Sequence, residues 1–261
     1  MFRRLLPVSA FVLVFAGCGG GSGPLTPQPE PPGPPEPPPP EATPGGVWQG
    51  TSSLGIGIVG LVSESGDFHF MQEDGLQLVG TLTTSGDGLS ANFVGYVPFG
   101  KKFKDGSTTG VGSLSGSFAG RSSISADISF TTSRGTASES TLELSYNPIY
   151  ERDSSLSAVA GNYLDTERNV VINVSDDGEF FSQDPRSHCI TNGTVSVIDP
   201  EFNLYRVEYE FSNCEGHNKN LNGTVAEGFA ALDDTQSPEV LILGVEVAAA
   251  GYSFAGVFPR S

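Results

Sequence analysis

Cysteine and histidine residues in the last third of the chain have types and spacing that could do chemistry. His188-Cys189 and Cys214-Glu215-Gly216-His217 place two thiols and two imidazoles within 30 residues. Thiolate sulfur and imidazole nitrogen are common protein ligands of zinc, so these residues could bind the metal if the two pairs meet in the fold. Alternatively, the two thiols form a disulfide, and zinc then loses its sulfur ligands. The redox state of the compartment decides between the two.

Other side chains lack the spacing of a catalytic motif. A serine nucleophile is expected on a Gly-x-Ser-x-Gly turn between a strand and a helix, whereas residues 112–116 read Gly-Ser-Leu-Ser-Gly and lie among predicted strands. His69 shares a strand face with Asp67, which we interpret as an exposed face rather than the site of a general base. Asp165 and Glu167 are interpreted as turn acids. We therefore expect no catalytic residue, no metal and no cofactor, and hence a protein that is not an enzyme.

The first 18 residues resemble the signal peptide of bacterial lipoproteins. The matching parts are a positive n-region (Met1 to Arg4), an apolar run (Leu5 to Phe15) and a small-residue lipobox (Ala16-Gly17-Cys18). Phe15 stands where that family usually has leucine. The resemblance implies that residues 1–17 are a signal peptide. It also implies that Cys18 receives a diacylglyceryl group and, after cleavage, an N-acyl chain such as palmitate, so that the membrane is its partner.

An uncleaved membrane anchor is the alternative interpretation of the same apolar run. A helix that spans a bilayer needs about 20 residues, whereas Leu5 to Phe15 has 11 and contains a proline. The lipoprotein interpretation is therefore favoured. Gly19 occupies the position where the family's inner-membrane retention signal has aspartate. The resemblance thus implies the outer membrane, on either its periplasmic or its outer face.

The implied compartment is oxidising, and this bears on the remaining cysteines. With Cys18 assigned to the lipid, Cys189 and Cys214 remain as a pair. We expect a disulfide between them, in preference to a zinc site or to a metal site made by His188 and His217 alone. Closing a loop of about 26 residues stabilises a fold by roughly 3.5 kcal/mol in the chain-entropy description.

Residues 18–44 have the composition of a tether rather than of a folded domain. They contain Gly19-Gly20-Gly21 and many prolines, including Pro37 to Pro40. Proline removes the backbone donor and favours extended polyproline II, so we expect a disordered linker. The formal net charge of the whole chain is −17, and cleavage would remove two arginines but no acid. Such an acidic chain offers no basic surface to phosphates, which argues against nucleic acid as a partner.

The rest of the chain has the pattern of an antiparallel all-β protein. Short apolar or alternating runs recur between turns rich in glycine, aspartate, asparagine and serine, and helical periodicity is nearly absent. Turns such as Ser65-Gly66 and Asp177-Gly178 supply the positive φ that tight hairpins need. An integral outer-membrane barrel is a rival interpretation, but the runs look shorter than its strands of about 9–11 residues. The predicted strands include residues 57–62, 68–71, 76–82, 89–96, 123–131, 141–146 and 252–258.

A weak internal repeat divides this β region into two parts. Gly46-Val47-Trp48 corresponds to Gly161-Asn162-Tyr163, and Ser63 to Phe68 corresponds to Ser175 to Phe180. We interpret the repeat as an internal duplication. The expected organisation is an N-terminal β domain at 45–148, a connector at 149–160 and a C-terminal β domain at 161–261 that holds the disulfide. Each domain is expected to be a small barrel or a sandwich.

A lipid anchor, a tether and an all-β body together favour a non-enzymatic lipoprotein that binds or scaffolds a partner. The alternative is a lipocalin-like carrier, because a barrel of about eight strands can hold one small apolar ligand. The partner is thus either a protein or a small apolar molecule. An enzyme acting on envelope polymers is a third hypothesis. Its sign would be a cleft in which His69, His188 or His217 meets a carboxylate.

Overall fold

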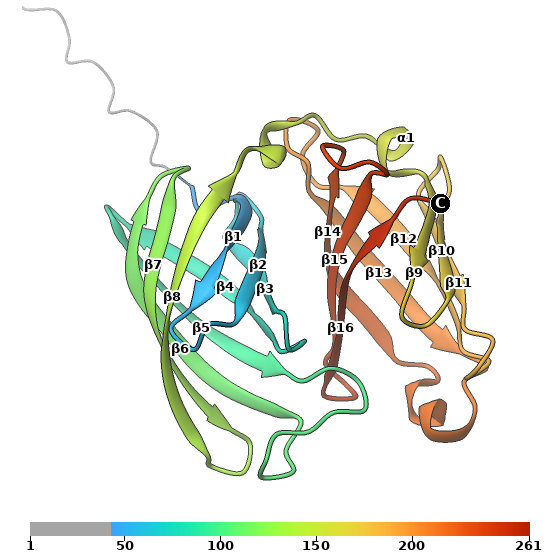
Figure 1. The fold of residues 1–261 in the computed structure, drawn as a ribbon, viewed down its shortest axis with the longest axis horizontal. Coiled ribbons are helices and arrows are strands. Elements are labelled where there is room, and N and C mark those ends of the chain that lie inside the picture. The colour runs from blue at the N-terminus through green and yellow to red at the C-terminus, as the bar shows by residue number, and fades with distance from the viewer. Residues whose placement is uncertain (1–42) are drawn as a thin grey trace, which may run out of the picture. The chain divides into compact units, whose positions relative to one another are not determined.

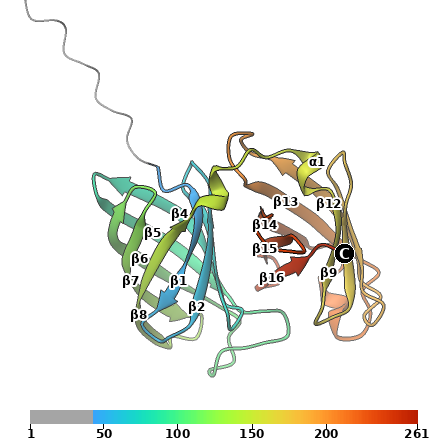
Figure 2. The same cartoon turned by 45° about the horizontal axis from the view of Figure 1, so that its top comes forward.

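The computed structural model describes residues 43–261 (Figure 1). The predicted signal peptide, the predicted lipidation at Cys18 and the predicted linker up to Ala42 lie outside these residues. In the described part, sixteen strands follow one another in chain order and form two eight-stranded antiparallel barrels (Figures 1 and 2). Both barrels belong to one compact unit, Glu41–Ser261. The prediction of two antiparallel all-β domains is confirmed, and the domains are barrels rather than sandwiches.

The first barrel is a closed meander. Each strand pairs with the next, and β1 also pairs with β8, from Val47 opposite Asn147 to Ser52 opposite Leu142. Burial alternates along β5 and β7, because every second side chain of a strand points to the same face. The strands are β1 (Gly46–Ser52), β2 (Gly57–Val62), β3 (Asp67–Gln72), β4 (Gln77–Ser85), β5 (Gly88–Tyr96), β6 (Thr109–Ala119), β7 (Ser123–Thr132) and β8 (Ala137–Asn147).

The second barrel has the same strand order but is not fully closed. Its first and last strands pair at one end only. There Tyr163 lies opposite Arg260, and the Ser261 amide donates to the Asn162 carbonyl at 2.9 Å. The short helices η1 (Pro148–Glu151) and α1 (Leu156–Val159) join the barrels, and η2 (Gly216–Leu221) lies between β13 and β14. The strands are β9 (Gly161–Asp165), β10 (Val170–Val174), β11 (Glu179–Gln183), β12 (Ile190–Val197), β13 (Tyr205–Ser212), β14 (Val225–Asp233), β15 (Val240–Val247) and β16 (Tyr252–Pro259).

The repeated motif places an equivalent aromatic residue at the start of each barrel. Trp48 on β1 and Tyr163 on β9 are both fully buried in the core of their barrel. The Trp48 Nε1–H donates to the Pro44 carbonyl at 3.1 Å, and the Tyr163 hydroxyl donates to the Val159 carbonyl at 2.7 Å. In both cases the acceptor lies four residues upstream. Each ring therefore ties the segment that enters a barrel to the core of that barrel.

The repeated hairpin turn is also equivalent in the two barrels. Gly66 and Gly178 have φ values of 91° and 86°, which glycine adopts without strain. The Gly66 carbonyl accepts from the Leu82 amide at 2.8 Å, and the Gly178 carbonyl accepts from the Val195 amide at 2.7 Å. The motifs that suggested a repeat therefore occupy matching places in the two meanders. Their common origin stays a prediction.

Three apolar clusters stabilise this arrangement, and one of them lies between the barrels. The interiors of the two barrels supply the other two. In the third, Val47 and Leu61 on the outer side of the first barrel pack with Phe229 of the second. Gly244 on β15 lies so close to the Met71 thioether that any larger residue would meet it. The absence of a side chain at Gly244 thus permits the close approach of the two barrels.

The buried hydroxyl of Tyr163 provides a test of its structural role. Tyr163→Phe keeps the ring but removes the donor to the Val159 carbonyl and the acceptor for the Arg260 guanidinium. We expect the free energy of unfolding, measured by urea denaturation, to fall by about 1–3 kcal/mol because buried polar groups lose their partner. Tyr252→Phe, at a half-buried tyrosine outside the core, is the matched control and should leave stability unchanged. An equal loss in both variants would contradict this role.

Candidate functional site

The second barrel contains a partly open cavity of about 130 Å³. The cavity occupies the half of the interior near the disulfide, whereas the fully buried Tyr163 and Tyr205 fill the opposite half. Inward side chains of β10, β11, β13, β15 and β16 contribute to its wall. Six aromatic residues line it: Phe99, Phe180, Tyr209, Phe211, Phe254 and Phe258.

The aromatic rings form a continuous wall. Phe180 and Tyr209 are stacked, with ring centroids 4.8 Å apart and an interplanar angle of 4°. Phe211 follows Tyr209 on the same face of β13, because side chains two residues apart point the same way. Its ring lies 5.3 Å from Tyr209 and 5.4 Å from Phe254. An apolar, planar molecule would thus meet ring faces and edges within this cavity.

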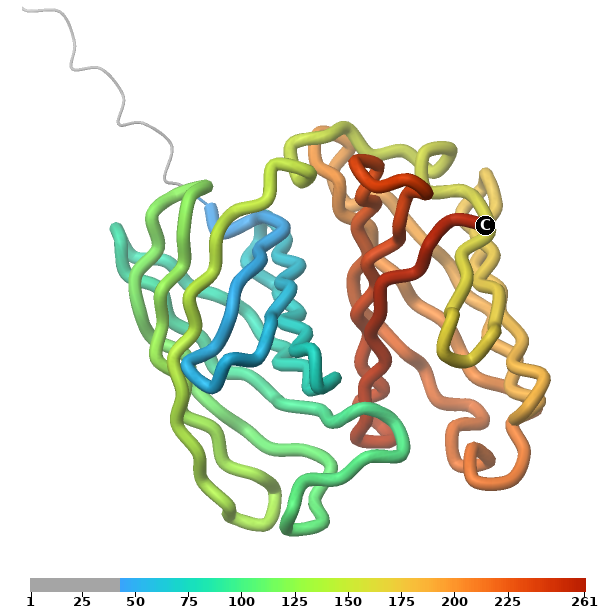
Figure 3. Tube along the Cα trace, in the orientation of Figure 1, coloured from blue at the N-terminus to red at the C-terminus, as the bar shows by residue number. Residues whose placement is uncertain are grey.

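A segment of the first barrel completes the wall of the cavity. Its backbone contacts with the second barrel lie at the start of β16, far from Arg260. The Phe99 amide donates to the Ser253 carbonyl at 3.1 Å, and the Ser253 amide donates to the Val97 carbonyl at 3.0 Å. The chain between β5 and β6 therefore extends to β16 (Figure 3). The Phe99 ring stacks at 5.7 Å on Phe254. The cavity is consequently built from both barrels.

Two charged residues at the rim of the cavity, Asp165 and Arg168, pair with each other. The Asp165 carboxylate accepts from the backbone amides of Glu167 and Arg168, each at 3.0 Å, and from the Arg168 guanidinium at 3.2 Å. Asp165 is thus the turn acid that the sequence predicted. The Arg168 guanidinium also lies 5.6 Å from the Phe254 ring centroid. These contacts leave neither charge free to dominate the cavity.

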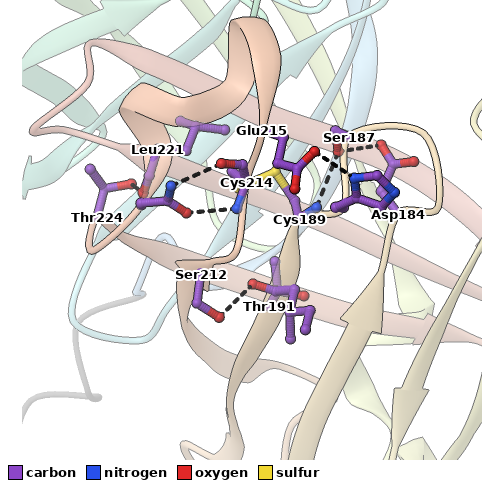
Figure 4. Close-up of a disulfide and its surroundings, with 12 residues drawn as sticks. Asp184, Ser187, Cys189, Thr191, Ser212, Cys214, Glu215, Leu221 and Thr224 are labelled. Carbon is purple, nitrogen blue, oxygen red and sulfur yellow. Dashed lines mark hydrogen bonds and ion pairs between the residues drawn. A yellow bond between two sulfur atoms is a disulfide. The ribbon is translucent and has the colours of Figure 1, made fainter.

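The predicted disulfide joins Cys189 and Cys214, with an S–S distance of 2.08 Å (Figure 4). The cysteines were expected within strands, but Cys189 directly precedes β12 and Cys214 lies two residues after β13. The bond therefore fastens the ends of two neighbouring strands beside the cavity, which Cys189 lines. The Asn222 side chain bonds both the amide and the carbonyl of Cys214, at 2.7 and 3.0 Å.

The disulfide also decides the zinc hypothesis. Both sulfur atoms are engaged, so neither is available as a thiolate ligand. His188 Nδ1 lies 2.9 Å from the Glu215 carboxylate, and both side chains are exposed. His217 is exposed on η2. Within residues 43–261, no group of three or more His, Cys, Asp or Glu side chains is arranged to hold a metal ion.

Comparisons with known proteins identify no family for this chain. No protein-family model matches the sequence, and no curated protein matches it. Within the part of the chain that the structure describes, no helix is long and apolar enough to cross a membrane. Function must therefore be inferred from the geometry of the chain itself.

An open groove of about 1,050 Å³ runs over the outer face of β4 to β7 in the first barrel. The described residues that line it are small, polar or apolar, and none is charged. Ser113 lies here, in the middle of β6, opposite Asn92 and Ser129. This is a strand interior rather than the strand-to-helix turn that activates a serine nucleophile, as the spacing around Ser113 predicted.

His69 does not lie on an exposed strand face, and that prediction was wrong. His69 is only 5% exposed, because β14 and β15 of the second barrel cover the outer side of β3. The Phe229 ring packs edge-on against the imidazole at 5.2 Å. Burial lowers the pKa of His69 to about 4, although a contact at 3.5 Å with Gln77 opposes the shift. A local sequence pattern could not reveal a cover supplied by residues more than 150 positions away.

Glu246 on β15 faces His69, with 3.5 Å between its Oε2 and the imidazole Nε2. Burial raises the pKa of Glu246 to about 7, and the negative charge of Glu227 adds to the shift. The neighbouring Gln77 is fully buried and donates to the carbonyls of Val245 and Phe254, at 3.1 and 2.7 Å. The Glu246 Oε2 atom makes no hydrogen bond, so its pair with His69 does not meet the sign of the enzyme hypothesis, and we interpret it as an interface contact. His188 and Glu215 are within hydrogen-bond reach, at 2.9 Å, but both side chains are exposed.

The opposite pKa shifts of His69 and Glu246 predict two effects of pH on stability that cancel each other in the parent protein. Because the His69 pKa falls from 6.5 to about 4, its contribution to the free energy of unfolding is lost as pH falls through 4. Because the Glu246 pKa rises from 4.5 to about 7, its contribution is lost as pH rises through 7. The two slopes cancel between pH 4.5 and 6.5. We expect Glu246→Gln to lose stability as pH falls through this range and His69→Gln to lose it as pH rises, each by about 1 kcal/mol per pH unit.

Urea denaturation at a series of pH values measures these slopes. His217→Gln changes an exposed histidine and serves as the control. It should keep the slope of the parent protein. Slopes of the same sign in Glu246→Gln and His69→Gln would contradict the assigned shifts.

Proposed function

We propose that the protein is a lipid-anchored, non-enzymatic binding protein of the bacterial outer membrane and that its second barrel holds a small apolar ligand. The lipoprotein-like N-terminus that ends in Cys18 supports the anchor. The aromatic cavity of the second barrel supports the binding role and is the observation that carries it. Binding is favoured over catalysis because the cavity is lined mainly by rings and aliphatic chains, and its carboxylates already accept hydrogen bonds from neighbouring groups.

The cavity volume limits the size of the ligand. A buried apolar cavity of about 150 Å³ stays dry and binds benzene, and the cavity here has about 130 Å³. A single ring or a short alkyl chain therefore fits, whereas a large lipid does not. Burial of the ligand's apolar surface would provide most of the binding free energy, at about 25 cal/mol per Å².

The first barrel is not a second site of the same kind. Its interior is packed with 18 buried apolar side chains, including Trp48, Phe68 and Phe93. A filled interior argues against the carrier hypothesis for this barrel. We propose instead that the first barrel supports the second, since it supplies Phe99 to the cavity wall and covers one side of β14 and β15.

Thermal unfolding of the full chain with toluene tests ligand binding. Near saturation, at about 100 times the dissociation constant, a ligand stabilises the folded state by about 2.7 kcal/mol. We expect a rise in Tm of about 5–10 °C. Ser182→Leu places a larger side chain in the cavity and should abolish the shift. Ser90→Leu, on the exposed outer face of β5, is the matched control and should keep it. A shift that survives in Ser182→Leu would place the toluene elsewhere.

Intact mass of the membrane-extracted protein tests the anchor. We expect cleavage before Cys18, added acyl mass on this residue, and protection of Cys189 and Cys214 from thiol blocking until the protein is reduced. Cys18→Ala should lose both the acyl mass and the membrane association. A mature, unlipidated and soluble protein would refute the proposed anchor while leaving the ligand test unaffected.

A further inference from the structure

We infer that the ligand of the second barrel carries a neutral hydrogen-bonding group on a single ring, as in a phenol or a pyrrole, and that the hydroxyls of Ser182 and Tyr209 bind this group. The inference rests on the proposed function, because it concerns the same cavity. It adds a chemical class to the size limit set by the cavity volume.

Two buried hydroxyls in the cavity wall have no partner within the described residues. Ser182 on β11 is 8% exposed and Tyr209 on β13 is 6% exposed, and both residues line the cavity. No hydrogen bond of the described residues involves either hydroxyl. By contrast, the hydroxyls of Tyr163 and Tyr205 in the same barrel donate to backbone carbonyls, at 2.7 and 3.2 Å. The tyrosines of the filled half are thus satisfied, whereas the tyrosine beside the cavity is not.

Neither hydroxyl oxygen is completely covered by neighbouring atoms. Among the described residues, the fully covered polar side-chain atoms without a partner belong to Glu239, Glu246 and Arg260. Ser182 and Tyr209 are absent from that group, so their oxygens keep access to a void. The cavity is the void that both residues line.

A hydroxyl that has no protein partner and remains accessible can bond to water or to a ligand. A ligand with a hydroxyl or an N–H could take the place of that water. Serine can donate or accept, and burial raises the pKa of Tyr209, so its hydroxyl stays protonated and can do both. The site would therefore accept a phenolic O–H or a pyrrole N–H at this point.

The surroundings favour a neutral ring over a charged ligand. The Phe180 ring stacks on Tyr209, so the polar group of the ligand would lie beside a ring face. The carboxylate and the guanidinium at the rim, Asp165 and Arg168, already pair with each other. An anionic ligand would lose its hydration without gaining an opposite charge. The remaining carboxylate of the lining, Asp184, already accepts from the Arg186 amide and the Ser187 hydroxyl, at 2.8 and 2.9 Å. A small ring with one neutral polar group satisfies both the rings and the hydroxyls.

Phenol and toluene, which have nearly the same size, test this inference on the full chain by calorimetry or chemical-shift titration. We expect both to bind the parent protein. Tyr209→Phe and Ser182→Ala should each weaken phenol binding at least tenfold and leave toluene binding unchanged, which also reports that the cavity is intact. Tyr252→Phe, which removes a hydroxyl outside the cavity lining, is the matched control and should leave both ligands unaffected.

Two results would overturn the inference alone. One is binding of toluene without binding of phenol, and the other is a phenol affinity that does not change in Tyr209→Phe and Ser182→Ala. Both would leave the proposed apolar ligand site in place. If neither ligand binds the parent protein, the proposed function fails together with the inference.

Discussion

The incomplete seam between β9 and β16 is the constraint on which the rest of the structure depends. An open sheet edge leaves amides and carbonyls without partners and invites pairing with other chains. Here Val97 and Phe99 of the first barrel pair with Ser253 at the exposed end of β16. This contact pairs one end of the edge, links the barrels and brings an aromatic ring into the wall of the cavity. A barrel that closed by itself would have had no place for that ring.

The need of buried backbone groups for hydrogen-bond partners also explains the polar side chains between the barrels. The buried Gln77 donates to two carbonyls of β15 and β16, and the barrels therefore meet through specific hydrogen bonds as well as apolar contacts. His69 and Glu246 are buried as a consequence, and burial drives both toward their neutral forms. Buried polar groups of this kind specify one arrangement, because any shift of one barrel would leave them without partners.

Strands, turns and the disulfide could be predicted from the sequence, whereas contacts between distant strands could not. Alternating runs and Gly-containing turns predicted six of the eight strands of the first barrel, and the pair of cysteines left after Cys18 in an implied oxidising compartment predicted the disulfide. In the first barrel β6 was missed because glycine and serine interrupt its apolar alternation. The roles of Phe99 and His69 depend on contacts with strands far away in the sequence. No pattern around either residue carries that information, so only the folded chain reveals the cavity wall and the interface.

The contribution of Phe99 to the second barrel has a consequence for how the two halves can evolve. If the halves arose by duplication, each copy began with a complete barrel and could vary on its own. In the present fold the segment between β5 and β6 forms part of the wall of the other barrel's cavity. A loop insertion in the first half of the chain would therefore alter the interior of the second, so the two halves can no longer vary independently.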